Sequence, residues 1–428
     1  MSTPVTAPLD RFFAARRPLA PLWLTDRSGT AGNRVVAAVS WPVAMVLVLH
    51  GIFVLAANGS VTDDFSTVHA AIRRFLTGTP VYNEVYRHVD PHYLYNPGAT
   101  LLLTPLGLIP DASLARGLFV LANAAAIVAA LALLTRLFGH RLSSAVFPVS
   151  VAAAFMTESV RNTLVFSNIN GILLLVFVGF LWLWLHDRRW LAGLALGLAI
   201  VVKPMFAPLI LLPLVRLDWR TVLGAVAVPV VTNAVAWSLV PGAGDYLSVV
   251  APYLSQTRDY ANSSLAGFAV YFDMPGALHA AVWLVLAALV GVGVLALLPW
   301  RVTDPLFWLA TSSGLLLTGV FLLSSLGQQY YSMMLFPMIF TLLLRTSVFH
   351  HAPAWLAAFL FLAPVSWVSE NWPNLGRWLS TFTATTGWAM LIAVTATAAV
   401  VWLIRGREGM SRGQVALKQE TARERSTP

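Results

Sequence analysis

The chain has 428 residues, of which 58% are hydrophobic and 11% are charged, and its formal net charge is +9. A water-soluble domain carries roughly 25% charged residues, so this composition excludes a soluble globule and indicates several membrane spans. Lys and Arg are scattered between apolar runs, which makes membrane topology, and not nucleic acid, the reason for the positive charge. Because the chain has no cysteine, disulfides and zinc-thiolate sites are excluded.

Apolar runs long enough to cross a bilayer follow one another along the chain. A polar, basic segment at 1–35 precedes them without a signal-peptide cleavage pattern, so we expect a cytoplasmic N-terminal segment and an uncleaved first anchor. Residues 36–405 form the predicted membrane domain, and 406–428 form a basic cytoplasmic tail that we expect to be disordered. The clearest spans are 36–57, 115–135, 142–157, 164–186, 221–241, 277–300, 305–327, 330–345, 353–369 and 386–404.

Two apolar stretches do not read as simple spans. Residues 97–110 are short and proline-rich, which favours a re-entrant segment. Residues 190–216 are interrupted by Lys203 and Pro204, and because proline removes a backbone donor we expect two short helices meeting there. The fold class is therefore an all-α, polytopic transmembrane bundle of about 10–13 membrane helices.

Charge sets the predicted orientation. Cytoplasmic loops are enriched in Lys and Arg, and most of these residues share one side if the N-terminus is cytoplasmic and 97–110 returns to the outer side. The C-terminus is then cytoplasmic as well. Acidic residues gather instead on the outward segments, chiefly 58–96 and 242–276. We therefore expect the working residues on the outer face of the plasma membrane.

The first outward loop begins with adjacent carboxylates, Asp63 and Asp64. Residues 65–77 have apolar side chains at helical spacing, which fits an amphipathic helix lying in the membrane interface. One interpretation is that Asp63 caps this helix and Asp64 lies in its first turn. The other is catalysis, with one carboxylate as general base for a sugar hydroxyl and the other positioning it or shifting its pKa. Both interpretations hold together if one of the two acids caps the helix and the other acts in catalysis.

Isolated polar residues in or near the spans are further candidates. Lys203 lies in an apolar stretch, where a charge is costly, and either binds a phosphate or extends to the interface. Arg161 and Asn168 belong to a polar patch that either joins helices or lines a ligand cavity. Arg258 lies in an outward loop whose aromatic, acidic and amide residues suit a sugar.

The sequence gives no sign of a cofactor. It contains no Walker motif, no dinucleotide fingerprint and no HExxH, and its cytoplasmic loops are too short for a nucleotide-sugar domain. His88 and His92 have the i,i+4 spacing of a helical metal site, but Pro91 disfavours a helix there, and we expect no metal. An activated substrate must therefore reach the outer face from the membrane itself.

Several long stretches resemble a known family. An outward acidic pair after the first span, with many spans following, is similar to the GT-C glycosyltransferases, which use polyprenyl-phosphate sugars. The segments NTLVFSNINGILLL, LALGLAIVVKPMFAPLILLPL and TRDYANSS more closely resemble the actinobacterial α-(1→3)-arabinofuranosyltransferases. The resemblance covers about residues 36–405.

The resemblance implies decaprenyl-phosphoryl arabinofuranose as donor and cell-wall arabinan, in arabinogalactan and lipoarabinomannan, as acceptor. It implies inversion at the sugar, with Asp64 as base and Asp63 supporting it. Some relatives carry a His where this chain has Gln329 and Tyr330. The expected phosphate-binding and sugar-binding residues are Lys203, Arg161, Arg258, Asn168, His92, Tyr95, Gln329 and Tyr330.

Two other functions compete with this interpretation. A transporter or flippase of a lipid-linked sugar predicts polar residues through the bilayer and at both faces, whereas this chain concentrates them at one face. A mannosyltransferase that uses polyprenyl-phosphate mannose differs only in the sugar, and composition does not separate it from the first interpretation.

Overall fold

The computed structural model describes residues 31–59, 63–86 and 91–424, with side chains as far as Arg405. Every regular element in these residues is helical, and none is a strand, which confirms the predicted all-α class. Residues 1–30, most of the predicted N-terminal segment, lie outside the described part of the chain.

Six of the described helices are long and apolar enough to cross a membrane. They are α3 (Ala31–His50) with its π-helical continuation η1 (Gly51–Ala56), α6 (Ala112–Leu137), α12 (Trp219–Leu239), α15 (Gly276–Leu297), α17 (Pro305–Leu323) and α20 (Pro373–Glu424). Shorter apolar helices of 10–17 residues complete the bundle. They are α7 (Val146–Phe155), α9 (Asn170–Leu185), α10 (Arg189–Val202), η3 with α11 (Pro204–Val215), η4 with α13 (Tyr246–Ser255), η5 to η6 (Gln329–Leu343) and α19 (Ala352–Leu362).

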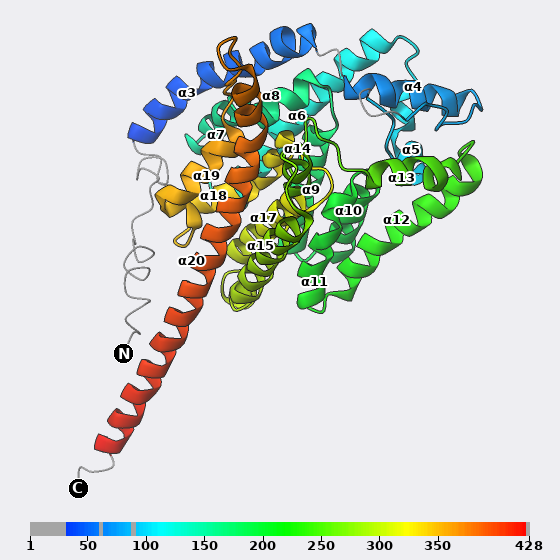
Figure 1. The fold of residues 1–428 in the computed structure, drawn as a ribbon. Coiled ribbons are helices and arrows are strands. Elements are labelled where there is room, and N and C mark those ends of the chain that lie inside the picture. Colours follow the sequence, from blue (N-terminus) through cyan, green and yellow to red (C-terminus); the bar gives the residue numbers. More distant parts are fainter. Residues whose placement is uncertain (1–30, 60–62, 87–90, 425–428) are drawn as a thin grey trace.

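The predicted interfacial helix is confirmed as α4 (Asp64–Leu76), with Asp63 as its N-cap. Its buried residues include Phe65, Val68 and Ile72, which recur at helical spacing and face the bundle. The helix begins where predicted because an aspartate side chain accepts hydrogen bonds from the free N–H groups of the first turn. In Figure 1, α4 lies with α5 and α13 at the right of the view.

The segment at 97–110 is too short to cross the membrane, as predicted. It forms α5 (Pro97–Leu103) and η2 (Thr104–Gly107), which begin at the N-cap Asn96. Gly98 lies against α12, where its N–H donates to Asn233 Oδ1 at 2.9 Å. A Cβ at Gly98 would stand 2.9 Å from that Asn233 side chain, so glycine is required for this close approach.

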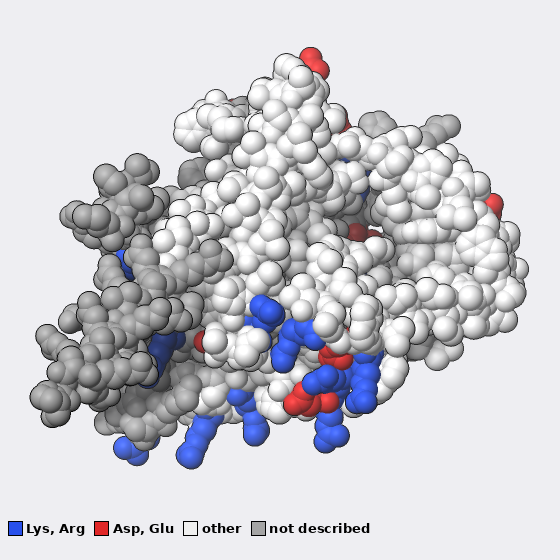
Figure 2. Space-filling view, turned by 90° about the horizontal axis from the view of Figure 1, so that it is seen from below, with Lys and Arg blue, Asp and Glu red and all other residues white. Residues whose placement is uncertain are grey.

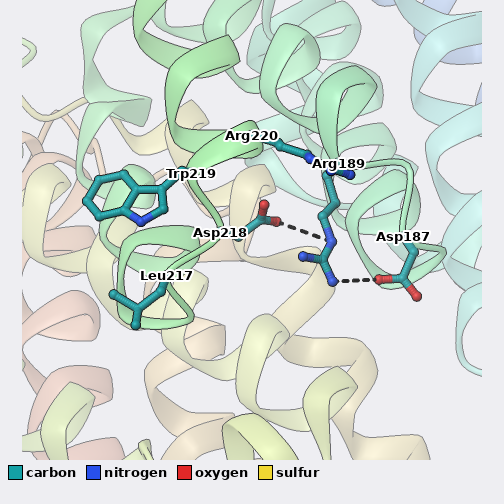
Figure 3. A pocket seen from close by; sticks show the side chains of 6 residues that line it. All are labelled: Asp187, Arg189, Leu217, Asp218, Trp219 and Arg220. Carbon is teal, nitrogen blue, oxygen red and sulfur yellow. Dashed lines mark hydrogen bonds and ion pairs between the residues drawn. The ribbon is translucent and has the colours of Figure 1, made fainter.

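The break in 190–216 falls at the predicted position. Helix α10 ends at Val202, and η3 begins at Pro204. The two ends of the segment lie together, because Thr221 Oγ1, just beyond it, donates to the Arg189 carbonyl at 3.1 Å. Figure 3 shows Arg189 between Asp187 and Asp218 at this junction. The chain therefore runs through the 14 residues of α10, about 21 Å, turns at Lys203, and returns through η3 and α11. We call this segment the hairpin and Lys203 its apex.

The predicted span at 164–186 is present as α9 (Asn170–Leu185), but its predicted start is wrong. Helix α8 (Glu158–Val165) ends, the chain turns, and α9 begins at Asn170. In the turn Ser167 has a left-handed φ of 49°, and Asn168 Oδ1 accepts from the Asn170 N–H at 3.1 Å. Short polar side chains compete in this way with the helical backbone bonds, which interrupts the helix.

The C-terminal helix also differs from the prediction. It begins at Pro373, before the predicted span at 386–404, and continues to Glu424. The helix thus extends through 406–424, part of the segment that we expect to be a disordered tail. No proline follows Pro373 until Pro428, so no proline interrupts the helix after the membrane segment. In Figure 1, α20 extends far beyond the bundle at the lower left.

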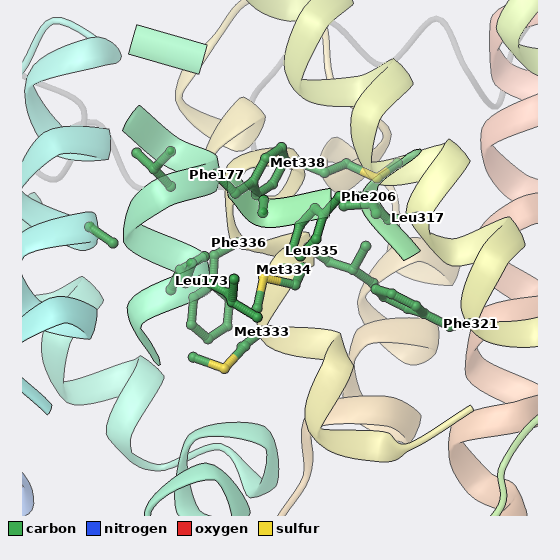
Figure 4. Packing of buried hydrophobic residues seen from close by; sticks show 14 of the residues in the cluster. Leu173, Phe177, Phe206, Leu317, Phe321, Met333, Met334, Leu335, Phe336 and Met338 are labelled. Atoms are coloured by element: carbon green, nitrogen blue, oxygen red, sulfur yellow. The ribbon is translucent and has the colours of Figure 1, made fainter. Parts of the chain in front are cut away.

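Large apolar side chains fill the centre of the bundle. Figure 4 shows Phe177 of α9, Phe206 of η3 and Phe321 of α17 packed around Met333 and Met334 of η5. Unbranched methionine fills the irregular space left between these short, broken helices. This core fixes η3, which directly follows Lys203, and η5, which contains Gln329 and Tyr330.

Loops predicted to share a face contact each other. At one face the Ala145 N–H donates to Asn33 Oδ1 at 3.2 Å, and at the other the Val81 N–H donates to the Pro241 carbonyl at 3.0 Å. Figure 2 shows Lys and Arg gathered along one edge of the molecule, with most of the visible surface uncharged. Such an uncharged band beside a basic edge is the arrangement expected of a polytopic membrane protein.

Candidate active site

A cavity of about 720 Å³ lies where the segments predicted on the outer side converge. Part of its lining is apolar and comes from the ends of α10 and α17, including Val202 and Phe321. Its polar lining comes from segments far apart in the chain and includes Asp64, His92, Tyr95, Lys203, Arg258, Gln329 and Tyr330. Seven of the ten predicted site residues therefore meet in one cavity.

Asp64 is the first residue of α4 and lines this cavity. Its backbone N–H donates to the Phe166 carbonyl at 2.9 Å, which fixes the start of α4 against the end of α8. Burial raises the pKa of Asp64 to about 6, and the nearby charge of Asp63 adds to the rise. Lys203 and Arg258 act in the opposite direction. A carboxylate with a pKa close to neutrality is suited to act as a general base.

Asp63 is turned away from the cavity, although it is the adjacent residue. Its Oδ1 accepts from the Phe65 N–H at 2.6 Å, which is the predicted N-cap, and its other oxygen pairs with Arg116. The side chain is buried and is not part of the cavity lining. The capping interpretation is thus confirmed for Asp63, and the two acids have different surroundings.

Lys203 is the residue at the break between α10 and η3. Its Nζ donates to Asn170 Oδ1 at 2.7 Å and lies 4.8 Å from the ring centre of Tyr331 and 5.5 Å from that of Tyr330. An ammonium has three N–H donors, and Asn170 takes one of them. The side chain therefore faces the cavity from the break between α10 and η3.

Arg258 reaches the same cavity from the outward loop at 242–276. Its guanidinium lies 5.5 Å from the ring centre of Tyr260, an aromatic contact that orients the planar group. The cavity thus holds one carboxylate and two cations, from α4, the hairpin apex and this loop. That combination suits an anionic ligand beside a hydroxyl that must lose a proton.

Aromatic and amide groups line the remainder of the cavity. His92 lies 3.4 Å, through Nδ1, from the Glu84 carboxylate, and its ring meets Tyr253 edge-on at 5.5 Å. Tyr330 packs edge-on against Tyr331 at 5.1 Å. Such rings stack on sugars, and the amide of Gln329 in the same lining both donates and accepts hydrogen bonds.

Two predicted ligand-binding residues do not reach this cavity. Arg161 is exposed on α8 and lies 3.6 Å from Glu158, one turn earlier. Asn168 is buried and lines a small separate void of about 10 Å³ beside Asp64. Sequence spacing placed both near a polar patch, but the turn at 166–169 directs Asn168 inward and leaves Arg161 on the outer surface of α8.

Three residues around the site are not among the expected site residues, although Asn170 belongs to the same polar patch as Asn168 and Tyr331 follows Tyr330. Asn170 and Tyr331 both contact Lys203, and Arg116 pairs with Asp63. Asn170 and Arg116 carry a signal in the sequence, because an amide or a charge within an apolar run needs a partner, whereas Tyr331 carries no such signal. No pattern in the sequence identifies that partner, since the contacts join different helices.

Of the two histidines with the spacing of a helical metal site, the structure describes only one. His88 lies outside the described residues, whereas His92 lines the cavity. Among the residues that the structure describes, no group of three or more His, Asp or Glu side chains has metal-binding geometry.

The helical membrane bundle and its cavity, with a raised-pKa carboxylate facing two cations, fit a membrane glycosyltransferase. The chain belongs to glycosyltransferase family 87, whose family model matches residues 93–325. It is a polytopic membrane protein of that family.

Curated relatives match most of the chain. The α-(1→3)-arabinofuranosyltransferase of Corynebacterium glutamicum is 56% identical over 385 residues, covering 90% of this chain and 91% of the relative. Proteins of the same name from Mycolicibacterium smegmatis and Mycobacterium tuberculosis are both 46% identical, covering 84% and 85% of this chain and 84% of each relative. No solved structure matches the chain significantly.

Proposed function

We propose that this chain is an inverting arabinofuranosyltransferase that forms α-(1→3) branches. The donor is decaprenyl-phosphoryl arabinofuranose, and the acceptor is the arabinan of arabinogalactan and lipoarabinomannan. The relatives' names support the sugar and the linkage. The observation that carries the chemistry is the meeting of Asp64, Lys203 and Arg258 in one cavity.

The reaction is a single displacement. Asp64 takes the proton of the acceptor hydroxyl as its oxygen forms a bond to the anomeric carbon of the donor. The bond from that carbon to the phosphate oxygen breaks on the opposite side, which inverts the configuration. The electron pair of the broken bond leaves with the lipid phosphate, and protonated Asp64 later releases its proton to water.

Lys203 and Arg258 hold the departing phosphate in this proposal. Lysine acts as a point charge, and the planar arginine fork binds two phosphate oxygens at once. Both act where negative charge increases during the reaction, which is where fixed cations accelerate it most. Arg161, exposed and beside Glu158, is not included.

The sugars occupy the aromatic part of the cavity. His92, Tyr95 and Tyr330 offer ring faces and polar edges, and Gln329 offers an amide. A volume of about 720 Å³ is within the usual range for ligand sites of roughly 300–1,000 Å³. Asn168 lines only the small void beside Asp64 and is therefore not assigned to sugar binding.

The site faces outward from the plasma membrane, with both termini cytoplasmic. Contacts between loops that share a predicted face support this orientation, as does the basic edge of the molecule. The lipid donor reaches the cavity from the bilayer, which agrees with the absence of nucleotide-binding motifs in the sequence.

Product linkage tests the proposed activity. Purified protein with lipid-linked arabinofuranose and a short α-(1→5) arabinan is expected to form 3,5-branched arabinose, detected by linkage analysis. Polyprenyl-phosphate mannose serves as the competing donor. Mannosyl transfer, or movement of the lipid-linked sugar across vesicles without a covalent product, would contradict the proposal.

The pH dependence of the rate tests the state of the base. Because Asp64 must be ionised to accept a proton and its pKa is about 6, kcat/KM is expected to rise with pH through about 6 and then level off. An ordinary aspartate would place this rise near 4. The measurement is the initial rate of transfer between pH 4.5 and 8, and a flat profile through pH 6 would contradict the assignment.

A further inference from the structure

A single arginine joins the segments that surround the proposed base. Arg116 lies near the start of α6, and its Nε pairs with the Asp63 carboxylate. Its Nη1 donates to the Ala56 carbonyl at 2.9 Å, and its Nη2 donates to the Val165 carbonyl at 3.2 Å. One side chain thus connects α6 with the end of the first span, the N-cap of α4 and the last residue of α8.

These contacts hold Asp64 on both sides. Asp63, the preceding residue, is fixed by Arg116, and the Asp64 N–H is bound to the carbonyl of Phe166, which follows Val165. Both anchors end at the same place, the junction of α8 with α4. Neither Arg116 nor Asp63 belongs to the cavity lining, so neither contacts the substrate there.

The packing around Arg116 leaves little room for another arrangement. Gly59 has a left-handed φ of 63°, and a Cβ there would lie 3.1 Å from Arg116 Nη2. The Arg116 side chain is 22% exposed, and its partner Asp63 is 11% exposed. The ion pair is therefore largely shielded from water, where both its geometry and its charge matter more than at a surface.

We propose that Arg116 is a positioning residue for glycosyl transfer, acting through Asp63 to hold the Asp64 carboxylate toward the cavity and to neutralise the charge beside it. This role rests on the proposed function of Asp64 as the base. Arg116 itself does not exchange a proton or touch the reacting atoms.

The role has an electrostatic consequence that simple packing lacks. Asp64 faces Lys203 from the hairpin apex, Arg258 from the outward loop, and the rings of Tyr95, Tyr330 and Tyr331. The charge of Asp63 raises the pKa of Asp64. Without Arg116 the negative charge of Asp63 is uncompensated, so the pKa of Asp64 should rise further. Without the charge on Asp63 its repulsion of the Asp64 carboxylate is gone, so the pKa of Asp64 should fall.

The test compares Arg116→Gln, Asp63→Asn and the double variant in purified form. Asparagine still caps α4, so Asp63→Asn changes charge more than structure. We expect Arg116→Gln to lower kcat by about 10- to 100-fold with KM for the lipid donor nearly unchanged, because small misplacements of a catalytic group cost this much. The rise of kcat with pH, which reports the ionisation of Asp64, is called the acid limb here. We expect the acid limb of Arg116→Gln to move to higher pH and that of Asp63→Asn to move to lower pH. The acid limb of the double variant should lie close to that of the parent.

Two further variants separate positioning from folding. Arg116→Lys keeps the charge, so its acid limb stays with the parent even where kcat falls. Arg74→Gln breaks another ion pair of the same loop, Arg74 with Glu84 at 2.6 Å, and is expected to leave the limb in place. If Arg116→Gln does not fold, Asp63→Asn and Arg116→Lys decide the question by the same criteria.

The inference would be overturned if folded Arg116→Gln kept both the kcat and the acid limb of the parent. It would also be overturned if the acid limbs of Asp63→Asn and Arg116→Gln moved in the same direction. Full activity of Asp64→Asn instead overturns the proposed base. The two failures are thus distinguished by different variants.

Discussion

Replacing Asp64 by asparagine is expected to lower kcat by about a thousandfold, because the amide keeps the shape of the side chain but accepts no proton. The start of α4 should persist, since the cap is the neighbouring Asp63 and the backbone N–H of residue 64 still reaches Phe166. The measurement is arabinosyl transfer from the lipid donor under saturating substrates. Donor binding, measured separately, should change little.

Asp63→Asn is the matched control, because it makes the same change one residue earlier. Its side chain caps α4, pairs with Arg116 and lies outside the cavity lining, so its loss of kcat should stay within the about 10- to 100-fold expected for Arg116→Gln and below that of Asp64→Asn. Equal losses in both variants would mean that the acidic pair acts as a unit. Parent-like transfer by Asp64→Asn would show that another group takes the proton.

Replacing Lys203 by methionine is expected to lower kcat by about 100- to 1,000-fold, the usual effect of removing one charged group that stabilises a leaving anion. Methionine keeps an unbranched apolar side chain against Tyr330 and Tyr331 while removing the ammonium. The measurement is kcat and KM for the lipid donor, with thermal unfolding of the purified variant as a check on the hairpin.

The chain has only one other lysine, Lys418, and Lys418→Met is therefore a matched control. It lies in the predicted cytoplasmic tail and should transfer sugar at the parent rate. A rise in KM for Lys203→Met without a fall in kcat would restrict Lys203 to ground-state binding. That result would leave Arg258 as the cation that acts on the departing phosphate.

Local signals in the sequence predicted the elements whose geometry they control. Asp63 caps α4 because its side chain reaches the N–H groups of the next turn, and Pro204 ends α10 because proline cannot continue its hydrogen bonds. Both effects act over a few residues, so the sequence alone was sufficient. The same reasoning missed the turn at 166–169, because apolar residues on both sides of it read as one continuous span.

Helix boundaries beyond the apolar runs were harder to predict. Hydropathy marks where a helix lies in lipid, not where it begins or ends in water. Helix α20 therefore starts 13 residues before the predicted span at 386–404 and continues beyond Arg405. Arg161 failed as a cavity residue for a related reason, because its direction depends on how α8 packs and not on its position in the sequence.

The sequence by itself determined that this protein is a polytopic helical membrane protein, with a capped interfacial helix and a hairpin broken at Lys203. Composition, periodicity and proline chemistry act locally and leave little choice. Only the tertiary structure decided that Asp64 and Lys203 share a cavity with Arg258, and that Asp63 pairs with Arg116 instead. Each of these contacts joins segments far apart in the chain, so it exists only once the helices have packed around their common core.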